Sequence, residues 1–155
     1  MKVIYVHHAE RDVSSNVEKQ EQDITEAGMK EASLFAEKLK QLKVTAIYTS
    51  PYLRCKHTAE ILNQYIQVPI YEESRFNEKD KNESWRECQE RNMEAIDDLV
   101  NTYQEDDDLV ICVTSGVNLS AFIFYFTKIK ASNENPWIQA VACSPVLFST
   151  NDKVL

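Results

Sequence analysis

The sequence predicts an α/β fold, a three-layer α/β/α sandwich with a mostly parallel central sheet. Short apolar, β-branched runs alternate along the chain with longer segments whose apolar residues recur at helical spacing. The 155 residues match the size of one ordinary domain, and 43% of them are hydrophobic, which suffices for a sizeable core. We therefore expect residues 1–155 to form a single domain.

The N-terminal part is predicted to contain two strands and one helix. Residues 3–6 are apolar and β-branched, which is typical of a buried strand, whereas residues 10–22 are polar and are predicted to form a surface loop. Thr25 precedes a helical pattern, and its hydroxyl can accept unpaired amide hydrogens at the helix start. Residues 44–49 predict a second strand. The apolar face of the helix is expected to contain Met29, Ala32, Phe35, Ala36 and Leu39.

The middle of the chain repeats this alternation. Ser50-Pro51 marks the start of another helix, because proline suits the first helical turn. Residues 68–71 contain a proline and are predicted as a strand near the sheet edge. Charged residues 72–83 form a second predicted loop, and a helix is expected over about 85–103.

The C-terminal part contributes the most apolar strand, residues 109–113, which is expected to be central in the sheet. Residues 114–116 lead into a helix over 117–126, and residues 141–149 predict a last strand broken at Pro145. In open parallel sheets, ligands bind at the carboxyl ends of strands. Such ends are expected at His7-His8, Thr49-Ser50 and Thr114-Ser115.

Composition excludes several function classes. A formal net charge of -8 argues against nucleic-acid binding, and no apolar run reaches transmembrane length. Charged residues begin at Lys2, so no secretory signal is expected, and we predict a cytoplasmic location without membrane attachment. With only two glycines, the chain lacks both the G-x-G-x-x-G motif and the phosphate-binding P-loop.

The four cysteines are widely spaced and are expected to be reduced, packed thiols. None is followed by arginine at the spacing that a cysteine phosphatase requires. No cluster of metal ligands is evident, since His7, His8 and Glu10 are too close in an extended segment to converge readily on one ion. We expect neither a metal nor another cofactor.

Two places in the sequence could support chemistry. His7 and His8 follow a predicted buried strand, where an imidazole can act as nucleophile and proton carrier, or can simply bind backbone groups at the sheet end. Arg54 lies near the start of the second predicted helix, where a guanidinium can bind phosphate through two hydrogen bonds. Taken alone, an arginine at this position is more often an ordinary surface residue.

Five blocks in this order resemble the signatures of the histidine phosphatase superfamily, the phosphoglycerate mutase-like proteins. His7-His8-Ala9 resembles Arg-His-Gly or Arg-His-Ala, and residues 24–28 resemble Leu-Thr-Glu-x-Gly. Residues 48–59 resemble Ser-Ser-Pro-x-x-Arg-x-x-x-Thr-Ala, which is the most specific block. Residues 75–78 are similar to the segment with the family's acid, and residues 113–116 correspond to Val-Ser-His-Gly.

The resemblance implies a mechanism. His8 would attack phosphorus to give a phosphohistidine, which water then hydrolyses, while Arg54 would bind phosphate oxygens. Glu78 would protonate the leaving group as general acid. Because the loop over residues 72–83 gives no unique register, Glu73 and Glu83 remain alternatives for that role.

Two positions depart from the family's pattern. His7 stands where the family has its first arginine, and Ser115 stands where it has a second histidine. Ser115 can donate one neutral hydrogen bond to phosphate and could cap the following helix, but it supplies no cation. Losing one charge-assisted donor typically costs on the order of 10²–10³ in rate. His7 and Ser115 are therefore predicted to complete a phosphate site whose positive charge is reduced.

These features favour a small phosphatase or phosphoryl-transfer protein that acts on a phosphorylated small molecule or a phosphoprotein. The short loop over residues 72–83 is expected to leave the site open to a bulky substrate. Two alternatives are a pseudoenzyme that binds a phosphorylated ligand or partner without turnover, and a scaffold with a vestigial pocket. Binding of phosphate or vanadate without hydrolysis would distinguish the first alternative from an enzyme.

Overall fold

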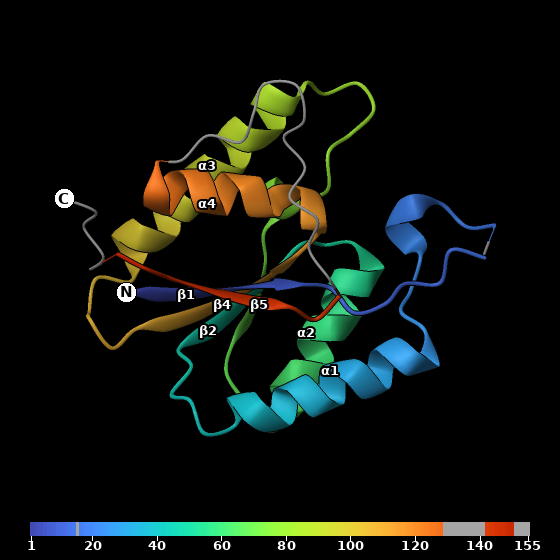
Figure 1. Cartoon of the computed structure of the whole chain (residues 1–155), viewed down its shortest axis with the longest axis horizontal. Coiled ribbons are helices and arrows are strands. Elements are labelled where there is room, and N and C mark those ends of the chain that lie inside the picture. The colour runs from blue at the N-terminus through green and yellow to red at the C-terminus, as the bar shows by residue number, and fades with distance from the viewer. Residues whose placement is uncertain (15, 129–141, 151–155) are drawn as a thin grey trace.

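The fold is a five-stranded sheet between two helical layers, within the described residues 1–14, 16–128 and 142–150 of the computed structural model (Figure 1). The sheet order is β3-β2-β4-β1-β5. Parallel pairing joins β1 (Lys2–His7), β4 (Leu109–Thr114), β2 (Ala46–Thr49) and β3 (Ile70–Glu72). β5 (Pro145–Ser149) pairs antiparallel with β1. The predicted mostly parallel sheet is confirmed, with the 109–113 segment central and β3 at an edge.

Helices cover both faces of this sheet, which confirms the predicted three-layer sandwich. α1 (Glu26–Leu39) and α2 (Leu53–Ile66) lie on one side, and α3 (Trp85–Thr102) and α4 (Leu119–Thr127) lie on the other (Figure 1).

Successive residues of β4 point to opposite faces, so this strand contributes to two hydrophobic clusters. Val110 packs in the same cluster as Phe122 of α4, whereas Ile111 packs in the same cluster as Leu62 of α2.

The start of α1 is attached to the chain that follows β1. The Thr25 side chain accepts a hydrogen bond from the Gly28 amide, at 3.0 Å, so the predicted helix cap is confirmed. The same hydroxyl donates to the Glu10 carboxylate, and the Thr25 amide donates to the Glu10 carbonyl, both at 2.8 Å. A Cβ at Gly28 would lie 2.6 Å from the Glu10 carbonyl oxygen, so only glycine allows this close approach.

Short 3₁₀ turns interrupt segments that the sequence predicts as irregular. The 10–22 loop contains η1 (Lys19–Glu21), and the 72–83 loop contains η2 (Ser74–Phe76). A third turn, η3 (Gly116–Asn118), precedes α4, so the helix predicted over 117–126 begins two residues later than expected, at Leu119. Three-residue turns satisfy only local hydrogen bonds and leave no periodic pattern in the sequence.

The positions of Pro51 and Pro145 within their elements differ from the prediction. Pro51 lies ahead of α2 rather than in its first turn, because Tyr52 is extended and the helix begins at Leu53. Pro145 begins β5 instead of breaking it, and it occupies an end of an edge strand, where a missing amide hydrogen is tolerated. The predicted start of that strand, residue 141, lies outside the described residues.

None of the helices in the described part of the chain is long and apolar enough to cross a membrane. Within the same residues, no group of three or more histidine, cysteine, aspartate or glutamate side chains is arranged to hold a metal ion. All four cysteines, Cys55, Cys88, Cys112 and Cys143, are free and buried.

Candidate active site

His8 directly follows β1 and is 6% exposed. Its amide donates to the Thr114 carbonyl at 2.9 Å, so it continues the pairing between β1 and β4. The ring Nδ1 lies 2.7 Å from the Ala9 carbonyl oxygen. A carbonyl oxygen only accepts hydrogen bonds, so Nδ1 carries the proton and Nε2 keeps its lone pair. The backbone thereby orients the imidazole and leaves its lone pair on Nε2.

Arg54, in the first turn of α2, fixes the same tautomer from the other side. Its Nε–H donates to His8 Nε2 at 3.1 Å, and arginine has no acceptor atom. The side chain of Arg54 is fully buried. Burial is the largest cause that lowers the pKa of His8 to about 3, and charge repulsion from His7, Arg54 and Arg11 acts in the same direction. The hydrogen bond to Ala9 acts in the opposite direction and raises the pKa. His8 is thus a neutral imidazole beside a buried cation at neutral pH.

The other two nitrogens of the Arg54 guanidinium bind two loops. Nη1 donates to the Lys19 carbonyl in η1, and Nη2 donates to Glu78 Oε2, both at 2.6 Å. The second oxygen of Glu78 forms a salt bridge of 2.6 Å with Lys19 Nζ. Lys19, Glu78 and Arg54 form a closed ring of contacts, which we call the Arg54 ring. These contacts join the 72–83 loop to Arg54 through Glu78; that the loop leaves the site open to a bulky substrate stays a prediction.

The structure brings Glu78 to Arg54 and holds the two alternative acids elsewhere. Glu73 binds Arg75 through both carboxylate oxygens, at 2.9 and 2.7 Å. Glu83 binds Arg91 at 2.6 and 2.8 Å. Hydrogen bonds from these arginines lower the pKa of both carboxyls.

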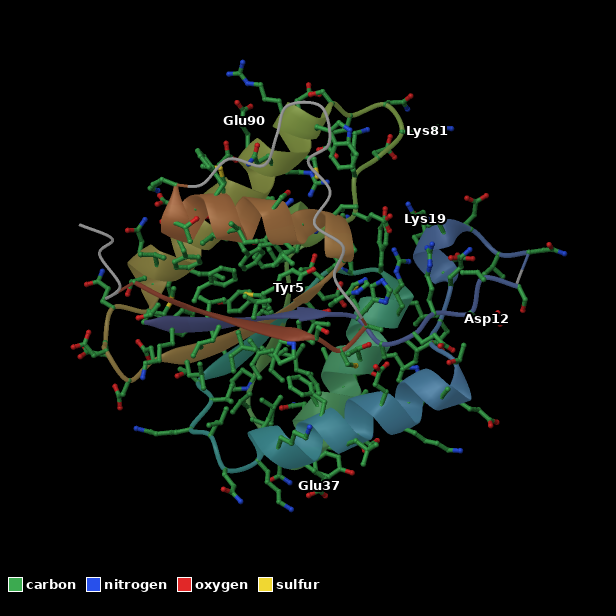
Figure 2. The ribbon with its side chains drawn as sticks, viewed as in Figure 1. Tyr5, Asp12, Lys19, Glu37, Lys81 and Glu90 are labelled. Atoms are coloured by element: carbon green, nitrogen blue, oxygen red, sulfur yellow. The ribbon has the colours of Figure 1, made fainter. Side chains whose placement is uncertain are left out.

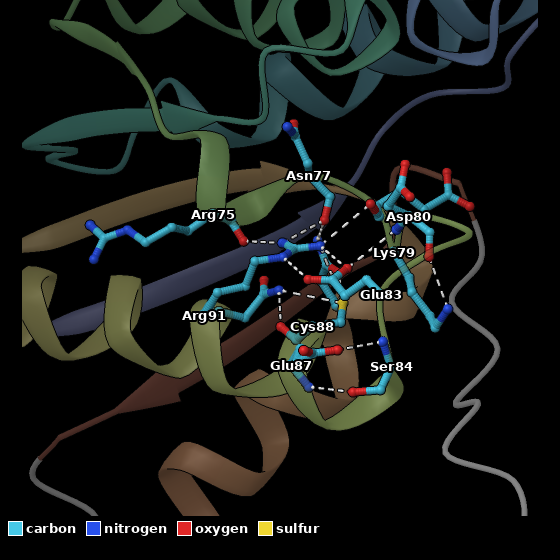
Figure 3. A network of polar contacts seen from close by, with 12 residues as sticks. Arg75, Asn77, Lys79, Asp80, Glu83, Ser84, Glu87, Cys88 and Arg91 are labelled. Atoms are coloured by element: carbon cyan, nitrogen blue, oxygen red, sulfur yellow. Dashed lines mark hydrogen bonds and ion pairs between the residues drawn. The ribbon is translucent and has the colours of Figure 1, made fainter.

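Arg91 of α3 fixes the loop that presents Glu78. Its guanidinium donates to the carbonyls of Arg75, Asn77 and Glu78, and to both oxygens of Glu83 (Figure 3). The side chain lies at the centre of this network (Figure 3). The loop backbone, despite its polar sequence, is thereby attached to a helix of the scaffold.

His7 and Ser115 lie next to His8. The His7 ring packs against the His8 ring, with centroids 4.3 Å apart. Ser115 follows Thr114, the residue paired with His7, and is 3% exposed. Its carbonyl accepts a hydrogen bond from the Tyr5 hydroxyl. Its own hydroxyl is buried and has no hydrogen-bond partner among the described residues, so the expected helix cap is not formed.

Two residues of the site were not singled out from the sequence. Thr58 Oγ1 accepts from the Ala9 amide at 3.0 Å and donates to the Arg54 carbonyl at 2.7 Å, so it joins the His8 segment to α2. The sequence does mark Thr58, because it follows Arg54 by one helical turn within the most specific block of the family resemblance. Lys19 lies in a polar stretch without periodicity, and no sequence signal marks it.

A pocket of about 380 Å³ adjoins this cluster between η1 and the start of α2. The ring of Tyr52 belongs to its wall and lies 4.8 Å from the Arg54 guanidinium carbon. Neither His8 nor Arg54 is among the residues that line it. It is lined by Gln20, Glu21, Pro51, Tyr52, Leu53, Lys56 and Asn77.

Comparison with known proteins identifies the family. The sequence profile of the histidine phosphatase superfamily (branch 1) matches residues 3–82, about half of the chain. The chain belongs to the histidine phosphatase superfamily. The uncharacterized phosphatase PhoE of Bacillus subtilis (strain 168) is 35% identical over 81 residues. That match covers 50% of this chain and 42% of the relative, so it spans less than half of the relative's length.

Solved structures support the histidine phosphatase fold over nearly the whole chain. YhfR of Bacillus stearothermophilus superimposes with a TM-score of 0.80 and 22% identity, covering 94% of this chain and 89% of that one. A mycobacterial glucosyl-3-phosphoglycerate phosphatase, solved in complex with VO3, gives a TM-score of 0.78 and 18% identity, covering 94% and 90%. At these identities the likeness concerns the fold.

Proposed function

We propose that this protein hydrolyses phosphate monoesters, or transfers their phosphoryl group, through a phosphohistidine on His8. The observation that carries the proposal is the contact between a neutral His8 and the fully buried Arg54. A neutral imidazole is a nucleophile, and a buried guanidinium stabilises charge on phosphoryl oxygens. The chain's membership of the histidine phosphatase superfamily supports the same chemistry.

The proposed reaction proceeds in two steps. His8 Nε2 forms a bond to phosphorus while the bond from phosphorus to the leaving oxygen breaks, and Glu78 donates a proton to that oxygen. Glu78, now a carboxylate, then accepts a proton from water while the water oxygen bonds to phosphorus and the bond from phosphorus to Nε2 breaks, which releases inorganic phosphate and restores the imidazole and the carboxylic acid. Glu78 is suited to this role because it contacts Arg54, where the phosphoryl oxygens would bind.

The pocket beside the Arg54 ring is proposed to accept the leaving group of a phosphorylated small molecule or phosphoprotein. Its walls include the ring of Tyr52 and the side chain of Leu53, which suit an apolar or aromatic group. His7 and Ser115 are proposed to make the reaction slow, because a serine hydroxyl replaces a histidine and leaves the phosphate with one cation fewer.

The direct test is phosphate release from an aryl phosphate by the wild type and by His8→Ala. We expect slow release by the wild type and none by His8→Ala. His57→Ala is the matched control. His57 also lies on α2, but its ring binds Asp23 and its side chain is partly exposed. Equal rates in the wild type and His8→Ala would contradict the proposed nucleophile.

Non-catalytic phosphate recognition is the second candidate function. It is favoured by the neutral Ser115, which supplies no cation, and by the salt bridges of Glu78 with Lys19 and Arg54, which engage the proposed general acid. A rise in melting temperature with vanadate, without any phosphate release, would identify a pseudoenzyme that binds a phosphorylated ligand. A protein that shows neither response would be a scaffold with a vestigial pocket.

A further inference from the structure

The Arg54 ring holds an anion between two cations. Glu78 Oε1 lies 2.6 Å from Lys19 Nζ, and Glu78 Oε2 lies 2.6 Å from Arg54 Nη2. Each carboxylate oxygen therefore has a cation of its own. A carboxylate held in this way fills the space beside Arg54 and neutralises the positive charge that an external oxyanion would need there.

Lys19 is held in this arrangement by its backbone. Its carbonyl accepts a hydrogen bond of 2.6 Å from Arg54 Nη1, so the buried guanidinium binds both the Lys19 main chain and the Glu78 side chain. Figure 2 shows Lys19 on η1, on the side of the molecule toward which β1 runs. Salt bridges between exposed side chains contribute little because both chains are free to move. Here the partner Glu78 is 15% exposed and η1 is anchored.

The charges fit a phosphate monoester better than they fit a carboxylate. Lys19 and Arg54 provide two positive charges, whereas Glu78 returns only one negative charge. A phosphate monoester dianion brings two negative charges and would balance both cations. Its entry at Arg54 would also release the Glu78 carboxylate, which must then take up a proton before it can act as the proposed proton donor.

We propose that Lys19 is a phosphate-binding residue that restores cationic charge missing at His7 and Ser115, and that Glu78 occupies the phosphate site until substrate displaces it. This inference rests on the proposed function and adds two properties to it. The site has a second cation from η1, and its resting state is closed by its own general acid.

The test of Lys19 measures inorganic phosphate and vanadate binding by calorimetry. Lys19→Gln is expected to weaken binding roughly tenfold to a hundredfold, because a hydrogen bond between charged groups is lost. Lys19→Arg is expected to keep the affinity within about threefold, since its guanidinium also binds oxyanions. Lys40→Gln is the matched control, because Lys40 also pairs with a glutamate and is 49% exposed, as Lys19 is.

The test of Glu78 expects a change in phosphate affinity opposite in direction to the change expected for Lys19→Gln. Glu78→Gln removes the competing negative charge, so phosphate affinity is expected to rise several-fold at neutral pH while aryl phosphate turnover falls. A purely structural role for Glu78 would lower both. Phosphate affinity that is unchanged or weaker in Glu78→Gln would overturn the claim that its carboxylate occupies the site.

The outcomes separate this inference from the proposed function. If the wild type binds phosphate and Arg54→Gln abolishes binding, while Lys19→Gln binds as tightly as the wild type, the role of Lys19 is overturned and the proposed phosphate site stands. If the wild type binds neither phosphate nor vanadate, both fall. Melting temperatures without ligand confirm that each variant is folded.

Discussion

The burial of His8 bears both on its proposed role as nucleophile and on the stability of the protein. Burial and neighbouring cations keep its pKa near 3, so protonation of the nucleophile does not compete with catalysis in mildly acidic solution. Any acid limb in the activity profile above about pH 4 must then come from another group. The same shift means that protons bind more weakly to folded His8 than to unfolded His8.

We therefore expect acid to destabilise the protein through His8. The unfolded chain takes up this proton near the ordinary pKa of 6.5, whereas the folded chain takes it up near 3. Stability thus falls as the pH drops from 6.5 toward 3, by up to about 1.4 kcal/mol per pH unit from this group. Urea unfolding between pH 7 and pH 4 measures it, and His8→Gln should show a shallower decline. Parallel declines in both proteins would refute the assignment.

His8 and Arg54 could be predicted residue by residue, because they lie within sequence blocks of fixed composition and spacing, whereas Glu78 could only be predicted as one of three loop carboxylates. Lys19 could not be predicted. Its position depends on a hydrogen bond to Arg54, 35 residues away in sequence, and on the ring that this bond closes. The pairing of Glu78 with Lys19 and Arg54 depends on the same long-range contacts and is equally absent from the local sequence pattern.

At the scale of elements, the packing of α1 controls the segment that carries His8. Gly28 lies under the Glu10 carbonyl, and Glu10 is two residues beyond His8. Helix α1 therefore serves as a support for the site as well as a cover for the sheet.

Gly28→Ala is expected to destabilise the protein by about 1–3 kcal/mol, because the new methyl group would lie 2.6 Å from a backbone oxygen. This exceeds the roughly 0.5–1 kcal/mol that alanine gains over glycine inside a helix. The displaced segment should also lower aryl phosphate turnover. Chemical denaturation and kinetics measure the two effects, with exposed Lys30→Ala as control. A Gly28→Ala protein as stable and active as the wild type would contradict the tight contact.

The sequence predicts which helices and strands exist better than it predicts their ends. Helix α1 was recognisable because five apolar residues follow the 3.6-residue period behind a capping threonine. The start of α2 was misplaced because proline is compatible with both the first helical turn and the extended segment before it. Turns η1 and η2 involve too few residues for any period to be visible.

At the scale of the whole molecule, the sheet separates two hydrophobic clusters that share the strands between them. That residues 1–155 form a single domain stays a prediction, as does a cytoplasmic location. Because neighbouring residues of β4 belong to different clusters, loss of packing on one face should weaken the other face too.

We expect Ile111→Ala and Phe122→Ala each to destabilise the protein by about 3–5 kcal/mol, since both side chains are fully buried and each substitution leaves a cavity. They lie in different clusters, yet each should shift one and the same urea transition. Far-ultraviolet circular dichroism and tyrosine fluorescence should report coincident midpoints. Two separable transitions, each sensitive to only one substitution, would show that the layers unfold independently.

The burial of the four cysteines has a consequence for oxidative stress. Burial raises the pKa of each thiol, to about 11 for Cys88 and about 12 for Cys55 and Cys143, so the thiolate that peroxide attacks is scarce. The proposed nucleophile is an imidazole nitrogen, which follows no such oxidation ladder. Dephosphorylation through His8 would therefore continue under oxidising conditions that inactivate phosphatases whose nucleophile is a cysteine.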